Sequence, residues 1–332
     1  MKWWKTVLPA AAIAGAGLLL AGAQDGRNAA LETLRSRGDA FTPLNFMIQA
    51  SLGKTESAML FIQAGMDVNA ENSCRYLPLV RASINGHLEV VKLLVAAGAH
   101  LDAKNIYGET ALVAAARHGQ LDVLRYLLSM GPDLEVRDNN GDTALLWAAL
   151  SGHETIVRLL LEKGAQIEAR NANGDTPLIA AAHSGQAGVL RLLVKAGAQV
   201  GARSKEGDTP LLVAAHYGNP ALVAYLVRHG ASLRHRNARG NPPLVTAAVW
   251  GSPSMVAQLL ELGADANGPG PAGMTPLMIA AARGQLKKVR LLIGHGADLR
   301  HTDDLGRTAL DYAATNGHVA MTLLLQPFAP GS

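Results

Sequence analysis

The sequence has few of the residues that build an ordinary globular core or a disulfide-linked domain. Only 4% of its 332 residues are aromatic, although 49% are hydrophobic. Cys74 is the one cysteine, so no disulfide can form within the chain, and a small buried side chain is its favoured interpretation. The core must therefore be built from aliphatic side chains, packed between short helices that the 35 glycines separate at regular turns.

A marked excess of charge of one sign is also lacking. Apart from Lys2 and Lys5, near the start of the chain, there are 28 basic and 26 acidic residues. A nearly neutral chain has little of the basic surface that binds nucleic acid. We find no glycine-rich phosphate loop, no paired metal-ligand spacing and no nucleophile–base motif. We therefore expect neither a nucleic-acid-binding protein nor an enzyme, and no cofactor.

Residues 1–23 have the pattern of an export signal. Two lysines accompany an uncharged run over residues 6–22, and residues 21–23, Ala-Gly-Ala, supply the small side chains that a signal peptidase recognises. We predict cleavage before Gln24 and a location in the periplasm of a Gram-negative bacterium. Because the run is about as long as the shortest membrane spans, an uncleaved anchor in the inner membrane is the alternative.

Internal repetition decides the architecture. Glycine recurs every 33 residues in two series that stay in phase over most of the chain. The first series is Gly53, Gly86, Gly119, Gly152, Gly185, Gly218, Gly251, Gly284 and Gly317, and the second is Gly65, Gly98, Gly131, Gly164, Gly197, Gly230, Gly263 and Gly296. Composition alone does not produce two such series, so we predict about nine repeats of one structural unit.

The local chemistry of one unit predicts two helices joined by turns. Thr143 can cap a first helix that ends at Gly152. A second helix, with a wide apolar face, is expected over residues 154–162 and ends at Gly164. A single pair of helices cannot bury its apolar faces, so neighbouring pairs must stack. The predicted fold class is an all-α repeat solenoid of helix-turn-helix units.

At the second helix the units resemble ankyrin repeats. Residues 86–94, Gly-His-Leu-Glu-Val-Val-Lys-Leu-Leu, followed by Gly98 and Ala99, match that helix closely, and residues 174–178, Gly-Asp-Thr-Pro-Leu, resemble the other half of the repeat. The resemblance covers roughly residues 45–326. It implies β-hairpin-like fingers, short inner helices lining a concave groove, longer outer helices behind them, and a role in binding other proteins.

One departure from the family concerns the contacts between repeats. The family commonly has a histidine after Thr-Pro-Leu, whereas this chain has apolar residues there. These residues are Val113, Leu146, Ile179, Leu212, Val245 and Met278. We therefore expect apolar contacts to replace the usual polar links.

The ends of the repeat region are also irregular. We predict a capping helix and linker over residues 24–44, repeats over 45–326, and a tail over 327–332 that begins at a helix-ending proline. The Thr-Pro pair at residues 42–43 lies two residues out of register. The finger over residues 267–273 contains two prolines and is expected to be stiffened or bent.

Candidate partner-binding residues lie at the ends of the inner helices and on one finger tip. Aromatic and arginine side chains dominate the energetics of protein interfaces. The predicted surface comprises Tyr107, Arg117, His118, Trp147, Leu150, His183, His216, Tyr217, Trp250 and Arg283. The alternative for the large rings is packing against neighbouring fingers.

Seven of the eleven histidines fall into two groups by their place in the repeat. His87, His153 and His318 occupy the turn position of the repeat, and His229 and His295 precede a Gly-Ala turn, so all five are expected to have structural roles.

His183 and His216, by contrast, occupy one slot of successive inner helices. Packed helices lie about 8–10 Å apart, which is too far for both imidazoles to bind one metal ion without adjustment. We expect these two histidines to be exposed recognition residues.

These features favour a non-enzymatic scaffold that clamps one folded, exported partner, as an assembly or protective factor. An immunity protein that blocks a toxin in the periplasm is a related alternative. A metal or haem carrier that uses His183 and His216 is an alternative of another class.

Overall fold

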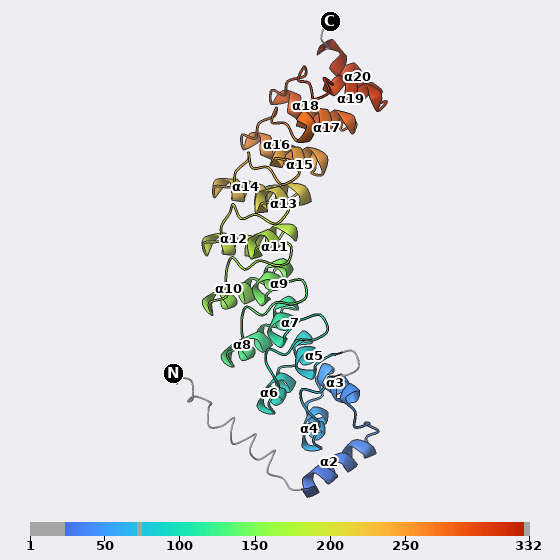
Figure 1. Ribbon diagram of the computed structural model, residues 1–332, viewed down its shortest axis with the longest axis vertical. Coiled ribbons are helices and arrows are strands. Elements are labelled where there is room, and N and C mark those ends of the chain that lie inside the picture. Colours follow the sequence, from blue (N-terminus) through green and yellow to red (C-terminus); the bar gives the residue numbers. More distant parts are fainter. Residues whose placement is uncertain (1–23, 72–74, 329–332) are drawn as a thin grey trace. The chain divides into compact units, whose positions relative to one another are not determined.

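The computed structural model describes residues 24–71 and 75–328, in two compact units, Met1–Gln166 and Ile167–Ser332 (Figure 1). The predicted signal segment and Cys74 lie outside the described residues. Within the described residues all regular structure is helical, which confirms the all-α class. None of the helices found there is long and apolar enough to span a membrane.

The first unit begins with a capping helix and continues as helix pairs. Its helices are α2 (Gln24–Ser36), α3 (Pro43–Ser51), α4 (Thr55–Gln63), α5 (Pro78–Ile84), α6 (Leu88–Ala96), α7 (Ala111–Arg117), α8 (Leu121–Ser129), α9 (Ala144–Ser151) and α10 (Glu154–Glu162). From α3 onward the odd-numbered inner helices stack on one another, and the even-numbered outer helices form a second row (Figure 1).

The second unit repeats the same pairing. Its helices are α11 (Pro177–His183), α12 (Ala187–Lys195), α13 (Pro210–Tyr217), α14 (Pro220–Arg228), α15 (Pro243–Val249), α16 (Pro253–Glu261), α17 (Pro276–Ala282), α18 (Leu286–Gly294), α19 (Ala309–Thr315) and α20 (Val319–Leu325), with short 3-10 helices η1 (Pro271–Gly273) and η2 (Gln326–Phe328). Each inner helix packs on its own outer helix and on the next inner helix. The predicted repeat solenoid is confirmed.

The helices begin and end where the sequence chemistry predicts. The Thr143 hydroxyl accepts a hydrogen bond from the Leu146 amide (3.4 Å) at the start of α9. Gly152 closes the same helix in the left-handed conformation (φ 83°), which L-residues with a side chain rarely adopt. Helix α10 spans the predicted residues 154–162. Local signals are therefore sufficient to place both helices of this unit.

Alanine and leucine fill the interior of both units. In α7 the residues from Ala111 to Ala116 are all buried, and small side chains let neighbouring inner helices approach closely. The residues in place of the family's histidine are at most 1% exposed, namely Val113, Leu146, Ile179, Leu212, Val245 and Met278. Apolar contact replaces the polar link, as expected.

The ends of the helix stack differ from its middle. Helix α2 packs on α4, and Arg27 Nε donates to the Ala64 carbonyl (3.0 Å). Helix α3 begins at Pro43, two residues before the predicted start of the repeats, because Thr42 caps it. At the other end α20 has seven residues instead of the nine of the other outer helices, and Pro327 lies in the following 3-10 turn.

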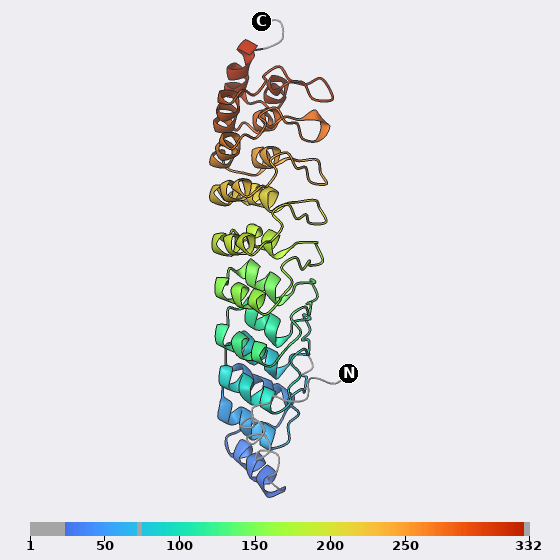
Figure 2. The same ribbon diagram turned by 90° about the vertical axis from the view of Figure 1, so that its left-hand side faces the viewer.

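The fingers of each unit project to one side of the helices (Figure 2). Their predicted β-hairpin-like character is not confirmed, since no strand occurs in the described parts of the chain. A finger such as residues 105–109 is instead a tight turn, closed by a hydrogen bond from the Asn105 amide to the Glu109 carbonyl (3.0 Å). The proline-rich finger forms η1, with Ala272 at φ 54°, so it is locally bent as predicted.

Candidate functional site

In the first unit, Trp147 is held by its own finger. Its indole N–H donates to Asp138 Oδ2 (2.8 Å), and the Arg117 guanidinium lies 4.2 Å from the ring centroid. Arg117 in turn forms an ion pair with the buried carboxylate of Glu109 (2.6 Å). The half-buried indole therefore packs against its own finger, and its role in partner binding stays a prediction.

The other candidates of the first unit differ in accessibility. Tyr107 is 54% exposed at a finger tip, where its hydroxyl lies 3.3 Å from that of Tyr76. His118 is exposed at the end of α7, and Leu150 is half-buried on α9. Partial desolvation lowers the pKa of His118, and the positive charge of Arg117 lowers it further. Tyr107 and His118 are thus the accessible members of this set.

The second unit brings four predicted residues into one continuous row of rings. The ring centroid of His183, at the end of α11, lies 5.3 Å from that of Tyr217. Tyr217 lies 4.7 Å from His216, and His216 lies 5.5 Å from Trp250. We call these four residues the aromatic row. The predicted neighbour Arg283 extends it, with its guanidinium 5.4 Å from the Trp250 ring.

Two side chains of the aromatic row are strongly exposed. Tyr217 is 59% exposed and Trp250 60%, although both rings contact neighbours. They occupy the same slot of successive repeats, at the carboxyl ends of α13 and α15, which explains why the rings follow one another. Clustered, exposed aromatic side chains beside an arginine have the composition of interface hot spots.

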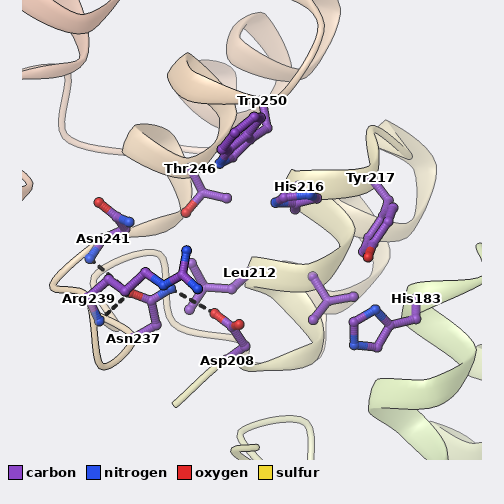
Figure 3. A pocket seen from close by; sticks show the side chains of 11 residues that line it. His183, Asp208, Leu212, His216, Tyr217, Asn237, Arg239, Asn241, Thr246 and Trp250 are labelled. Carbon is purple, nitrogen blue, oxygen red and sulfur yellow. Dashed lines mark hydrogen bonds between the residues drawn. The ribbon is translucent and has the colours of Figure 1, made fainter. Parts of the chain in front are cut away.

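A polar hollow of about 180 Å³ lies beside the aromatic row (Figure 3). The row forms part of its wall, together with Leu212 and Val213 of α13 and Thr246 of α15. Fingers supply the remaining lining, Asp208, Asn237, Arg239 and Asn241. Sequence reasoning found the row but missed these finger residues, because their convergence depends on how successive fingers stack.

The five histidines expected to be structural all bond to backbone carbonyls. At the turn position, ring nitrogens of His87, His153 and His318 lie 2.9, 3.2 and 3.1 Å from carbonyl oxygens at the end of the inner helix in the preceding repeat. His229 and His295 each bond the carbonyl four residues earlier in their own helix, at 2.8 Å. These predictions are confirmed.

The carrier alternative depends on His183 and His216. The Tyr217 ring contacts both imidazoles, so the two histidines do not face one another directly. In the part of the chain that the structure describes, no three His, Cys, Asp or Glu side chains come together as potential metal ligands. The observed arrangement thus offers a stacking surface.

Lys288 is a second feature that the sequence analysis missed. This lysine on α18 is only 3% exposed, and its ammonium group donates to the carbonyls of Ala247 and Ala248 at the end of α15 (3.1 and 2.9 Å). Burial lowers its pKa, and the charge of Arg283 adds to the shift. Its slot is aliphatic in other repeats, for example Val90, Val123 and Ile156, so comparing repeats could have revealed it.

Comparison with known proteins gives one result. A family model described as ankyrin repeats, in three copies, matches residues 44–138, 130–204, 196–269 and 266–329. The matches overlap and together span most of the chain. No curated protein matches the sequence.

Proposed function

Because the chain belongs to the ankyrin repeat family, we propose that it is a non-enzymatic scaffold that binds a folded, exported protein in the periplasm. Ankyrin repeats generally mediate protein–protein interaction, and the family is typically without catalytic activity. The aromatic row of the second unit is the proposed contact surface, and the exposed finger tip at Tyr107 extends the set of contacts in the first unit.

The exposure of Tyr217 and Trp250 carries this proposal. Each leaves more than half of a large ring in contact with water, at the carboxyl ends of inner helices that are otherwise well packed. Burying such rings in a complex removes apolar area from water at little cost in conformational freedom, because the row already holds them in place. A preformed aromatic surface of this kind favours one rigid partner surface.

Export is the part of the proposal that rests on sequence alone. The uncharged run and the Ala-Gly-Ala site within residues 1–23 support it. With one cysteine in the chain, stability in an oxidising compartment depends on packing and not on disulfides. An assembly or protective factor for another exported protein is consistent with these features.

Site-specific photo-crosslinking in cells tests the proposed surface. A photoreactive phenylalanine replaces Tyr217 or Trp250 in turn, and Leu323, which is 63% exposed on α20 of the same unit, serves as the matched control position. We expect one discrete crosslinked protein from positions 217 and 250 and none from position 323. The identity of that protein separates an assembly factor from an immunity protein. Equal crosslinking at all three positions, or none at any, contradicts the proposal.

A further inference from the structure

One slot of the inner helix, on the side that faces the finger, varies from repeat to repeat. It holds a large ring in two repeats, Trp147 in α9 and Tyr312 in α19, and Thr246 in α15. Other repeats have Arg81, Ala114, Ala180, Val213 and Ile279 there. Where a ring is present, its polar tip binds the aspartate of its own finger: Trp147 Nε1 donates to Asp138 Oδ2 (2.8 Å), and the Tyr312 hydroxyl donates to Asp303 Oδ2 (2.6 Å). In these two repeats the slot therefore accommodates a ring that ends in a hydrogen-bonding group.

Thr246 leaves this slot open. Its side chain is far shorter than an indole or a phenol, and it lines the hollow beside the aromatic row (Figure 3). The Thr246 side chain is only 7% exposed, yet its hydroxyl has no hydrogen-bond partner among the described residues. A buried hydroxyl without a partner is costly, and it indicates a position where an incoming polar group would be stabilised.

The finger at this slot carries Asn237, where the fingers of Trp147 and Tyr312 carry an aspartate. Asn237 Oδ1 accepts hydrogen bonds from the Arg239 and Asn241 amides (3.1 and 3.0 Å), as Asp138 and Asp303 do in their own turns. Its Nδ2 group, however, is a donor, and it binds Asp208 Oδ1 (2.8 Å). Asp208, from the preceding finger, thus becomes the acceptor that faces the hollow.

The hollow then presents one acceptor and two donors. The second carboxylate oxygen of Asp208 can accept, while the Thr246 hydroxyl and the Arg239 guanidinium, which lines the same hollow, can donate. A ligand that satisfies all three must both donate and accept through one terminal group. Hydroxyls and carboxamides do this, and among them only the phenol of tyrosine adds a ring that can pack on His216 and Trp250. An indole N–H, an ammonium or a guanidinium group only donates, and a phenyl ring does neither.

We propose that this hollow binds a tyrosine side chain of the partner protein, in the place that Trp147 and Tyr312 fill within the chain itself. The inference rests on the proposed scaffold function and specifies the chemistry of its partner. The hollow is large enough for the ring of a tyrosine, since its volume is about 180 Å³ and a cavity of about 150 Å³ accepts a benzene ring. The adjacent rings of His216 and Trp250 offer the edge and face contacts that aromatic side chains prefer.

Binding of small amino-acid amides tests the proposal directly. N-acetyltyrosinamide is titrated into the full chain and followed by NMR at the amides of Asn237, Asn241 and Thr246. We expect saturable binding with a dissociation constant on the order of 1 mM. N-acetylphenylalaninamide should bind at least about fivefold more weakly, because it lacks the hydroxyl that meets Asp208. Equal binding of the two amides, or tighter binding of N-acetylargininamide, overturns the phenol assignment.

Two variants at one position locate the site. Thr246→Tyr fills the slot as Tyr312 fills its own, so the chain should fold normally by circular dichroism and lose tyrosinamide binding by at least about tenfold. Thr246→Val keeps the hollow open but removes the hydroxyl that would meet the phenol, so tyrosinamide binding should weaken by about threefold to tenfold, less than in Thr246→Tyr. Unchanged binding to Thr246→Tyr overturns the site.

The partner captured through the aromatic row separates this inference from the proposed function. Thr246→Tyr should lower the affinity for that partner while leaving the exposed faces of Tyr217 and Trp250 intact. If it binds the partner as tightly as the wild type does, and the aromatic row is still required, the tyrosine inference fails and the scaffold function stands. If the aromatic row is not required either, both fail.

Discussion

Trp147 and Trp250 lie in different environments, although their sequence positions look alike. Trp147 and Trp250 both lie near the carboxyl end of an inner helix, and both were candidates for partner binding. Asp138 and Arg117 hold Trp147 against its finger, whereas Trp250 leaves 60% of its side chain exposed. The position of a residue on the helix predicts where its ring lies, but the surrounding side chains decide whether the ring is exposed to solvent.

The hydrogen bond of Trp147 provides a stability test. Trp147→Phe keeps most of the ring area and removes the indole N–H, which leaves one oxygen of the buried Asp138 carboxylate without that donor. We expect the free energy of unfolding in urea to fall by about 1.5–3 kcal/mol, as for hydrogen bonds to charged groups. Trp250→Phe is the control and should change it by less than about 0.5 kcal/mol, as at exposed sites. Similar losses for both variants would contradict the assigned roles.

The environment of Asp303 predicts that the stability of the fold decreases in acid. Hydrogen bonds from the Tyr312 hydroxyl (2.6 Å) and from Arg307 (2.8 and 3.0 Å) hold the pKa of its carboxyl well below the usual 3.8. Because the folded state favours the ionised form, the stability that this group contributes is present above pH 4 and is lost as the pH falls further.

The matching measurement compares the wild type with Asp303→Asn. At pH 7 the variant should melt several degrees lower, and the difference between the two proteins should shrink steadily between about pH 4 and pH 2. Hydrogen exchange in α19 should report the same trend locally, since Asp303 joins the finger to that helix through Tyr312. A difference in melting temperature that stays constant over this range would show that ionisation of Asp303 is not involved.

At the scale of helices, sequence reasoning succeeds where the signal is local. The Thr143 cap and the glycines Gly152 and Gly164, both left-handed, placed α9 and α10 correctly, and the repeat period carried that pattern along the chain. The β-hairpin-like fingers were not confirmed, and a five-residue turn such as 105–109 is too short to form a strand ladder. Sequence reasoning also missed Asp208 and Thr246, which meet only when successive repeats stack.

The carboxyl end of α15 depends on a side chain from the next repeat. Gly251 does not adopt the left-handed conformation that ends most inner helices, and Lys288 supplies hydrogen bonds to Ala247 and Ala248 there. Arg283 donates to the carbonyl of Val249 (3.1 Å). Two cations therefore stabilise the negative end of the helix that carries Trp250.

Replacement of this lysine gives a prediction for the helix. Lys288→Met places an aliphatic side chain where other repeats have one, but it removes the donor to the buried carbonyl of Ala248. We expect a loss of about 1–3 kcal/mol from the unsatisfied carbonyl, with faster hydrogen exchange at the end of α15. A Lys288→Met protein as stable as the wild type would mean that the desolvation cost of the ammonium offsets its hydrogen bonds.

At the scale of the whole molecule, each unit is a stack in which a repeat contacts its neighbours. Such proteins gain stability from successive interfaces and present side chains of equivalent slots in register. The register places Tyr217, Trp250 and Arg283 in one line within the second unit, and it explains why the repeat pattern led to these residues from sequence alone. The chemistry of the partner is set instead by slots that break the repeat, above all Thr246.

Export is a prediction for the molecule as a whole. We expect the protein to be recovered from the periplasmic fraction with Gln24 as its first residue, because cleavage follows the Ala-Gly-Ala site. Mass spectrometry of the purified protein measures this. Recovery from the membrane fraction with residues 1–23 retained would instead support the anchored alternative.

The affinity for the crosslinked partner tests the central claim most directly. Calorimetry compares the wild type, a Tyr217→Ala/Trp250→Ala variant, and a Val319→Ala/Leu323→Ala control whose side chains are at least as exposed in the same unit. If the aromatic row is the binding surface, the first variant remains folded and its dissociation constant rises about 100-fold, while the control stays within about twofold of the wild type. A folded aromatic-row variant that binds with wild-type affinity would contradict the account.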